Sequence, residues 1–342
     1  MTRLFILTTT AALAFAQTPA AIRLKQNPLI TQQMSPRLGD DINGPSIIRV
    51  PRWVKNPLGR YYLYFAHHKG SYIRLAYANN PAGPWKIYEP GVLDVKDTAF
   101  YRPQPDPPNL AANFYTHVAS PEVVIDDANQ RLVMFVHGWY TNGEAWPAAA
   151  RKQGYGQFTQ TATSNDGAHF TVRPGLTART SYERIFRWNN TWYSMGRLGI
   201  VGRAEGLLEP FEQGPNPFAR TTVAGRVRHV ATLLRDRKLY VFFSAIGDAP
   251  EEILLSTIAL NDDWQTWRAT PPVRVLHPEA SYECTNLPLT PSKAGEAEGP
   301  EHALRDPGLI EDNGRVLLFY SYCGEQGLAA ADVTAFVTTL VR

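Results

Sequence analysis

The sequence repeats one layout five times. Each segment opens with a polar or acidic residue, continues as an apolar run, turns, returns as an aromatic-rich run and closes with polar residues. Such runs, separated by Gly, Pro, Asn and Asp, are typical of antiparallel β-structure. The five segments are DDINGPSIIRVPRWVKNPLGRYYLYFAHHKGS, HVASPEVVIDDANQRLVMFVHGW, TSYERIFRWNNTWYSMGRLG, RVRHVATLLRDRKLYVFFSAIGD and ALRDPGLIEDNGRVLLFYSYCGE.

The spacing of these segments predicts the fold. Their leading polar residues recur about every 45 to 80 residues, and units of this size fill the chain. Small antiparallel sheets repeated around an axis form a β-propeller. We therefore predict an all-β protein, a five-bladed β-propeller. A β-sandwich followed by a second domain is the alternative, but a sandwich has no reason to repeat the same polar start five times. The leading residues are Asp41, Glu122, Glu183, His229 and Asp306.

The first residues, MTRLFILTTTAALAFAQ, combine one basic residue, a short apolar run and small residues, as secretory signal peptides do. The predicted domains are a signal peptide, residues 1–16, and a single five-bladed propeller, residues 17–342. The apolar run is too short to span a bilayer, and no later segment qualifies. We therefore expect a secreted or periplasmic protein that is not inserted into a membrane.

Charge and cysteine content narrow the function further. The formal net charge is +3, and the basic residues are scattered, which favours neither a nucleic-acid partner nor an anionic membrane surface. The two cysteines, Cys284 and Cys323, could form one disulfide in an exported protein or remain as two buried thiols. Their spacing is not that of a metal site.

The propeller geometry predicts where the polar residues meet. The first strand of each blade lines the central channel and the second runs back antiparallel to it, so the start of one and the end of the other share a rim. Glu183 and the other leading residues should therefore point into one funnel. The residues that follow the second strands reach the same rim: His67, His68, Lys69, His137, Arg197, Asp248 and Glu325.

Several of these side chains suit sugar binding. His67 and His68 are adjacent on an alternating strand, so only one of them can face the funnel. The long segment after the second blade's hairpin is rich in aromatic residues, which suit the apolar faces of sugar rings, so Trp139 or Trp146 should line the cleft or simply pack within the loop. The predicted substrate-binding residues are His67, His68, His137, Trp139, Arg197 and His229.

Carboxyl groups at one mouth indicate glycoside hydrolysis. Neighbouring like charges raise the pKa of at least one carboxyl group, and the reaction needs one protonated and one ionised carboxyl. Groups about 6.5–9.5 Å apart leave room for a water molecule and give inversion. Ordinary roles compete with this interpretation, because Glu122 could form a structural ion pair with an arginine and Asp41 or Asp306 could cap a turn.

Three short motifs give the chain a resemblance to a known family. SPEVVI contains Glu122, SYERIFRWNNTWY contains Glu183, and NNPAGPW, which ends at Trp85, is similar to a blade turn. Together with the layout, they resemble the five-bladed propeller glycosidases of glycoside hydrolase family 43 and its clan relatives. The resemblance implies that Glu183 is the general acid and that Glu122 orients it and tunes its pKa.

The general base departs from the family pattern. Where the family has Asp-Pro in the first blade, this sequence reads GPS, with Gly44 at the aspartate position. Asp41, three residues upstream, is the first choice for the base. Asp306, followed by Pro307 in the fifth blade, is the second choice.

The predicted function is an exported glycoside hydrolase that cleaves oligo- or polysaccharides with inversion. The alternatives are a non-catalytic carbohydrate-binding propeller and a sialidase-like or phosphorolytic enzyme on the same scaffold. We expect a carbohydrate partner and no cofactor, since the chain has no histidine pattern typical of a transition-metal site. The family resemblance allows a structural Ca²⁺.

Overall fold

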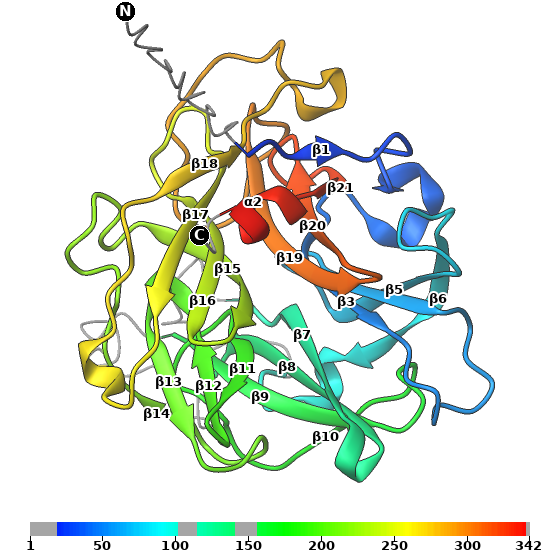
Figure 1. Ribbon diagram of the computed structural model, residues 1–342. Helices are drawn as coiled ribbons and strands as arrows, with labels where there is room; N and C mark the ends of the chain where they lie inside the picture. Colours follow the sequence, from blue (N-terminus) through cyan, green and yellow to red (C-terminus); the bar gives the residue numbers. More distant parts are fainter. Residues whose placement is uncertain (1–18, 102–114, 141–155, 340–342) are drawn as a thin grey trace, which may run out of the picture.

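The computed structural model describes residues 19–101, 115–140 and 156–339, and it confirms the five-bladed β-propeller (Figure 1). The predicted signal peptide and Trp146 lie outside these residues. Five antiparallel sheets surround a central axis, and the first strand of each sheet is the innermost. No helix in the described residues is long and apolar enough to cross a bilayer.

Blades 1 to 4 each contain four strands in chain order. Blade 1 has β3 (Asn43–Arg49), β4 (Tyr61–Ala66), β5 (Tyr72–Ala78) and β6 (Lys86–Asp94). Blade 2 has β7 (Ala119–Asp126), β8 (Arg131–Trp139), β9 (Gln157–Ser164) and β10 (Thr171–Val172). Blade 3 has β11 (Arg184–Trp188), β12 (Thr191–Met195), β13 (Val201–Ala204) and β14 (Glu212–Gln213). Blade 4 has β15 (Val227–Arg235), β16 (Lys238–Ala245), β17 (Ile253–Ala259) and β18 (Val273–Leu276).

Blade 5 joins the two ends of the described chain. Its inner strands are β19 (Leu304–Asp312), β20 (Arg315–Tyr322) and β21 (Gly327–Asp332). The outer edge of β21 pairs with two short N-terminal strands, β1 (Ile22–Arg23) and β2 (Ile30–Thr31), which Figure 1 shows beside the C-terminal strands. The ring is therefore closed by backbone hydrogen bonds between sequence-distant segments. The short helix α2 (Thr334–Thr339) follows β21.

Short 3₁₀ helices lie in the connections of the described chain. They are η1 (Gln32–Met34), η2 (Pro36–Leu38), η3 (Val95–Asp97), η4 (Asp127–Asn129), η5 (Arg197–Gly199), η6 (Trp264–Thr266) and η7 (Ser281–Glu283). A disulfide bond joins Cys284, just after η7, to Cys323, just after β20. The first of the two interpretations of the cysteines is thus the one that the structure shows.

Continuous apolar strands form because the blades pack face to face. Alternate residues of a strand point to opposite faces of its sheet. In β4, Tyr62 and Tyr64 belong to the apolar cluster shared with blade 2, whereas Leu63 and Phe65 belong to the cluster shared with blade 5. All six residues of β4 are buried. A strand buried on both faces needs an unbroken apolar run, which explains the sequence YYLYFA.

A β-bulge marks the start of the inner strand in blades 1, 2, 4 and 5. In three of these blades the bulge contains a residue with left-handed φ followed by proline: Gly44 (61°), Ser120 (46°) and Asp306 (52°). Bulges re-aim side chains near functional sites. Asp306 in blade 5 therefore occupies the position that Gly44 occupies in blade 1.

Candidate active site

A buried polar cluster lies where the inner strands begin and the second strands end. We call it the mouth cluster. Nearly all its members come from the strand ends that the sequence predicted to share a rim, and all except Tyr182 are buried. They are Asp41, His68, His137, Tyr182, Arg228, His229, Glu251, Arg305, Asp306 and Glu325.

Asp41 and Glu325 form a carboxyl pair. Asp41 precedes β3 and is 7% exposed, and Glu325 follows β20 and is 2% exposed. Burial and the nearby Glu325 raise the pKa of Asp41 to about 9, with a hydrogen bond between the two carboxyl groups. The pKa of Glu325 is held well below its usual range: burial would raise it, but the charges of His68, Arg305 and Arg228 outweigh burial. The pair therefore holds one proton, and that proton is on Asp41 at neutral pH.

Further contacts hold this pair in place. The side chain of Asn43 donates to Oδ1 of Asp41 at 2.7 Å, and the backbone N–H of Ile42 donates to the carbonyl of Glu325 at 2.6 Å. His68 places Nδ1 3.6 Å from Oε2 of Glu325. Burial lowers the pKa of His68, but the adjacent Glu325 carboxylate raises it more, so the net shift is upward.

Asp306 supplies a second carboxylate at the mouth, close enough to Asp41 to raise its pKa. Asp306 is fully buried. Its Oδ1 contacts Nδ1 of His229, and its Oδ2 accepts a hydrogen bond from the hydroxyl of Ser321 at 3.4 Å. The aspartate is therefore oriented from blade 4 and from its own blade.

A network of arginines neutralises the remaining carboxylates. Glu251 is fully buried and accepts hydrogen bonds from Arg228 at 2.7 and 3.2 Å. It also forms an ion pair with Arg305 at 2.9 Å. Arg305 reaches Glu301 and, at 3.5 Å, Glu325. Because Arg228 and Arg305 share Glu251, and Arg305 also reaches Glu301 and Glu325, the network fixes the mouth cluster across blades 4 and 5.

A row of rings forms the opposite side of the mouth. The ring of Tyr182 lies between His229, with centroids 3.8 Å apart, and His137, at 4.2 Å. His117 follows at 5.7 Å from His137. Burial lowers the pKa of His117 to about 4 and that of His137 well below its usual value, so both imidazoles are neutral. Burial raises the pKa of Tyr182 to about 12.

Arg184 closes the channel beneath the mouth. Its guanidinium donates to backbone carbonyls of the four other blades, those of Val230, Pro121, Pro45 and Pro307, at 2.9 to 3.3 Å. It also donates to Oε2 of Glu122 at 2.6 Å. These contacts place the arginine at the centre of the ring.

The structure therefore gives Glu122 the ion pair with an arginine that sequence analysis considered as its ordinary role. Its carboxylate also accepts a hydrogen bond from Ser46 at 3.1 Å. The predicted role of Glu122 in orienting the general acid stays a prediction.

Glu183 does not join the mouth cluster, contrary to the expectation that it points into the funnel. Its carboxyl group lies beside Gly196 and Thr180 and lines a cavity of about 10 Å³ with other residues of blade 3. The strand begins one residue later, at Arg184, whose side chain faces the channel instead. Burial raises the pKa of Glu183 to about 8, with the nearby Ser194 hydroxyl acting in the opposite direction. The role of Glu183 as proton donor stays a prediction.

The remaining predicted residues take different positions. Of the two adjacent histidines, His68 joins the mouth cluster, whereas Nε2 of His67 lies 3.3 Å from Asp40. Trp139 ends β8 and packs against Gly156. Arg197 begins η5, and its backbone N–H donates to the carbonyl of Ser181, the residue before Tyr182.

Three mouth residues could in principle hold a metal ion. Ligand atoms of Asp41, His68 and Glu325 all lie within 4.8 Å of one another. Ca²⁺ prefers an all-oxygen ligand set, which a histidine does not provide. The three side chains are also satisfied by one another through the shared proton, so the residues present do not fit the structural Ca²⁺ that the family resemblance allows.

Sequence analysis missed several important residues. The sequence places Glu325 at the rim but does not pair it with Asp41, and it does not mark Tyr182, Glu251 or Arg305 as site residues. Tyr182 immediately precedes Glu183, so its position in the repeat was an available signal. Glu251 follows β16 at the same rim, but nothing in the sequence pairs it with two arginines.

Comparisons with known proteins agree with this fold. No family model matches the chain. The chain is 30% identical over 333 residues to uncharacterized protein R118 of Acanthamoeba polyphaga mimivirus, with 91% of this chain and 89% of that protein covered.

Solved structures are similar at much lower identity. A protein of Parabacteroides distasonis described as a candidate glycoside hydrolase has a TM-score of 0.59 at 12% identity, covering 93% of this chain and 97% of that one. The α-L-arabinofuranosidase of Lactobacillus brevis has a TM-score of 0.51 at 11% identity, covering 90% and 92%. The family 43 protein BlXynB of Bacillus licheniformis has a TM-score of 0.52 at 11% identity, covering 91% and 54%. These likenesses confirm the resemblance at the level of the fold.

Proposed function

Because the chain belongs to the same family as protein R118 of the mimivirus and has the fold of the five-bladed glycosidases, we propose that it is a glycoside hydrolase. It cleaves oligo- or polysaccharides at the mouth of the propeller. The feature that supports this proposal most directly is the buried carboxyl pair of Asp41 and Glu325, in which burial, Glu325 and the charge of Asp306 raise the pKa of Asp41 to about 9. Two carboxyl groups in different environments are what glycoside hydrolysis requires.

Asp41 is the proposed general acid. A proton donor to the glycosidic oxygen must be protonated at the working pH, and the pKa of Asp41 is raised to about 9 by burial and by Glu325. Glu325 is hydrogen-bonded to Asp41, so the two are too close for a water molecule to act between them. Glu325 therefore serves to keep the proton on Asp41.

Asp306 is the proposed general base. His229 and Ser321 hold its carboxylate in a fixed orientation, as a base that positions a water molecule requires. Attack by that water on the sugar gives inversion. Sequence analysis suggested Asp41 as the first choice for the general base and Asp306 as the second. Here Asp41 is the acid instead, and Asp306 is the base.

Export remains part of the proposal. The sequence predicts a signal peptide in residues 1–16, and the disulfide between Cys284 and Cys323 suits an oxidising compartment. Expression of the full chain with a C-terminal tag, followed by fractionation and N-terminal sequencing of the product, tests whether the chain is cleaved after Ala16 and leaves the cytoplasm.

Activity is tested with a set of aryl glycosides and oligosaccharides. Wild type, Asp41→Asn and Asp306→Asn are compared, with Asp236→Asn as the control because Asp236 is exposed on the turn between β15 and β16. We expect both mouth variants to lose turnover while the control retains it, and NMR of the first product formed to show an inverted anomeric configuration. Full activity of either mouth variant would remove its assigned role.

A non-catalytic carbohydrate-binding propeller is the second candidate function. It is favoured by Gly44, which stands where the family places a catalytic aspartate. This function predicts saturable binding of an oligosaccharide without any product after long incubation.

A further inference from the structure

The two sides of the mouth differ in charge. The carboxyl groups Asp41, Asp306 and Glu325 come from blades 1 and 5, and each has a partner. The side formed by blades 2 and 3 presents neutral rings. Asp306 touches His229 at one end of the row of rings, and the charges of Asp306 and Glu325 act on Tyr182 from the blade 5 side.

Arg197 lies on the blade 3 side, and its guanidinium has no partner among residues 19–101, 115–140 and 156–339. The other arginines near the channel are paired: Arg184 with Glu122, Arg228 with Glu251, and Arg305 with three carboxylates. The side chain of Arg197 forms neither a hydrogen bond nor an ion pair with any described residue. It is partly exposed, and its backbone is tied to the residue before Tyr182.

A second unsatisfied group lies close to this arginine. Nδ1 of His137 is buried and has no hydrogen-bond partner among the described residues, and its ring packs against Tyr182. A buried polar atom without a hydrogen-bond partner costs about 1–3 kcal/mol of folding stability. Such an atom therefore calls for an explanation, and a bound ligand or water is one. The backbone N–H of Arg197 donates to the carbonyl of Ser181, the neighbour of Tyr182, so Arg197 lies beside the ring pair of Tyr182 and His137. Its positive charge acts to lower the pKa of both groups.

We propose that the substrate carries an anionic group, a carboxylate or a sulfate ester, which Arg197 binds on the blade 2 and 3 side of the mouth. A guanidinium binds such groups through paired hydrogen bonds. The carboxylates of blades 1 and 5 repel an anion from their own side, so the substrate binds in one orientation. The acidic sugar then lies toward Arg197 and its glycosidic bond toward Asp41.

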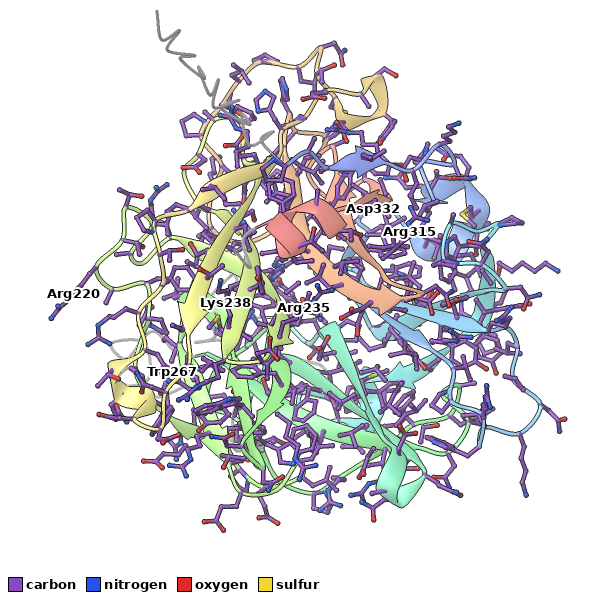
Figure 2. All side chains as sticks on the ribbon, viewed as in Figure 1. Arg220, Arg235, Lys238, Trp267, Arg315 and Asp332 are labelled. Carbon is purple, nitrogen blue, oxygen red and sulfur yellow. A yellow bond between two sulfur atoms is a disulfide. The ribbon has the colours of Figure 1, made fainter. Side chains whose placement is uncertain are left out.

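This inference rests on the proposed glycosidase function but is tested separately by binding. Isothermal titration calorimetry of the full chain uses three size-matched oligosaccharides: one of uronic acids, one sulfated and one neutral. Arg197→Gln and Arg197→Lys are compared with wild type. Arg220→Gln is the matched control, because Arg220 is exposed and projects from the edge of the molecule (Figure 2).

We expect one anionic oligosaccharide to bind, and the one that binds distinguishes carboxylate from sulfate. Arg197→Gln should weaken its binding about tenfold or more, Arg197→Lys should weaken it less, and Arg220→Gln should bind as wild type does. Binding should also weaken as salt increases. The proposal is overturned if no anionic oligosaccharide binds, if the neutral one binds as tightly, or if Arg197→Gln binds as wild type.

Product release measured on the same mixtures separates the two proposals. Arg197-dependent binding of an anionic oligosaccharide without any cleavage would support this inference and contradict the glycosidase function. Cleavage of a neutral oligosaccharide that is unaffected by Arg197→Gln would support the glycosidase function and contradict this inference.

Discussion

Asp41 and Glu325 come from opposite ends of the propeller sequence, yet their carboxyl groups share a hydrogen bond at the mouth. The adjacent backbone is joined as well, since the N–H of Ile42 donates to the carbonyl of Glu325 at 2.6 Å. The same two blades are neighbours because the ring is closed between the first and the last of them. The proposed acid therefore exists only when the ring is complete.

Replacement of Asp41 by asparagine tests the proposed acid. The amide keeps the size of the side chain but has no acidic proton, so we expect hydrolysis to fall about 10²-fold or more. The measurement is kcat on the best oligosaccharide, together with a thermal unfolding curve to show that the variant is folded. Asp236→Asn makes the same chemical change on an exposed turn, and an equal loss of activity there would contradict the interpretation.

The raised pKa of Asp41 predicts a dependence of stability on pH. A folded-state pKa of about 9 lies above the unfolded value near 3.8, so the folded protein holds a proton that the unfolded chain has lost. This stabilisation is complete below pH 4 and declines as pH rises toward 9, by at most about 1.4 kcal/mol per pH unit. The lowered pKa of Glu325 acts in the opposite sense, but only in acid, where stability is lost as pH falls below the ordinary glutamate range.

The measurement is urea unfolding between pH 6 and pH 9. Glu183 also titrates in this window, so the test is the difference between wild type and Asp41→Asn. We expect the free energy of unfolding of the variant to decline less steeply with pH. Parallel slopes in the two proteins would mean that Asp41 is not protonated in the folded state.

Glu183→Gln tests whether Glu183 is the general acid, as the family resemblance implies, or a buried carboxyl group of blade 3 that takes no part in catalysis, as its position indicates. The carboxyl group lies within blade 3, away from the mouth cluster, so we expect kcat to stay within about threefold of wild type. Because burial raises its pKa to about 8, the substitution should also remove part of the decline in stability between pH 5 and pH 8. A loss of activity as large as that of Asp41→Asn would restore Glu183 as the proton donor.

The difference between the expected and observed positions of Glu183 shows what the sequence can determine. The five blades and the shared rim could be predicted, because apolar runs and turns recur with a regular spacing. The face of the blade to which the Glu183 side chain points could not be predicted. Tyr182 adopts φ of 62° and the strand begins at Arg184, one residue later than expected. A shift of one residue moves every side chain to the other face.

Side-chain contacts between residues of different blades could not be predicted from the sequence either. Nothing local to Glu325 indicates Asp41, and nothing local to Glu251 indicates that two arginines surround it. These contacts depend on how the ring closes and how the bulged strands are aligned. By contrast, Asp306 could be predicted, because it leads the fifth repeat and is followed by a proline, both of which are local features.

The disulfide should contribute measurably to stability. It closes a loop with a sequence separation of 39 residues, for which chain entropy predicts a stabilisation of about 3–4 kcal/mol. We expect the double variant Cys284→Ser, Cys323→Ser to lose about this much in denaturant unfolding, with reduced wild type as the chemical control. Equal stability of the oxidised and reduced wild type would show that the bridge does not constrain the unfolded chain.

We expect Arg184 to contribute strongly to the stability of the folded propeller. Its guanidinium bonds to carbonyls of all four other blades and to Glu122. Arg184→Met keeps much of the side-chain volume but removes the donor to those carbonyls and the ion-pair partner of Glu122, which should cost about 3–5 kcal/mol. If part of the lost stability comes from the unpaired Glu122 carboxylate, then adding Glu122→Gln to Arg184→Met should restore part of the free energy of unfolding. Urea unfolding of the two single variants and the double variant measures this coupling, and strictly additive losses would mean that the backbone contacts alone carry the stabilisation.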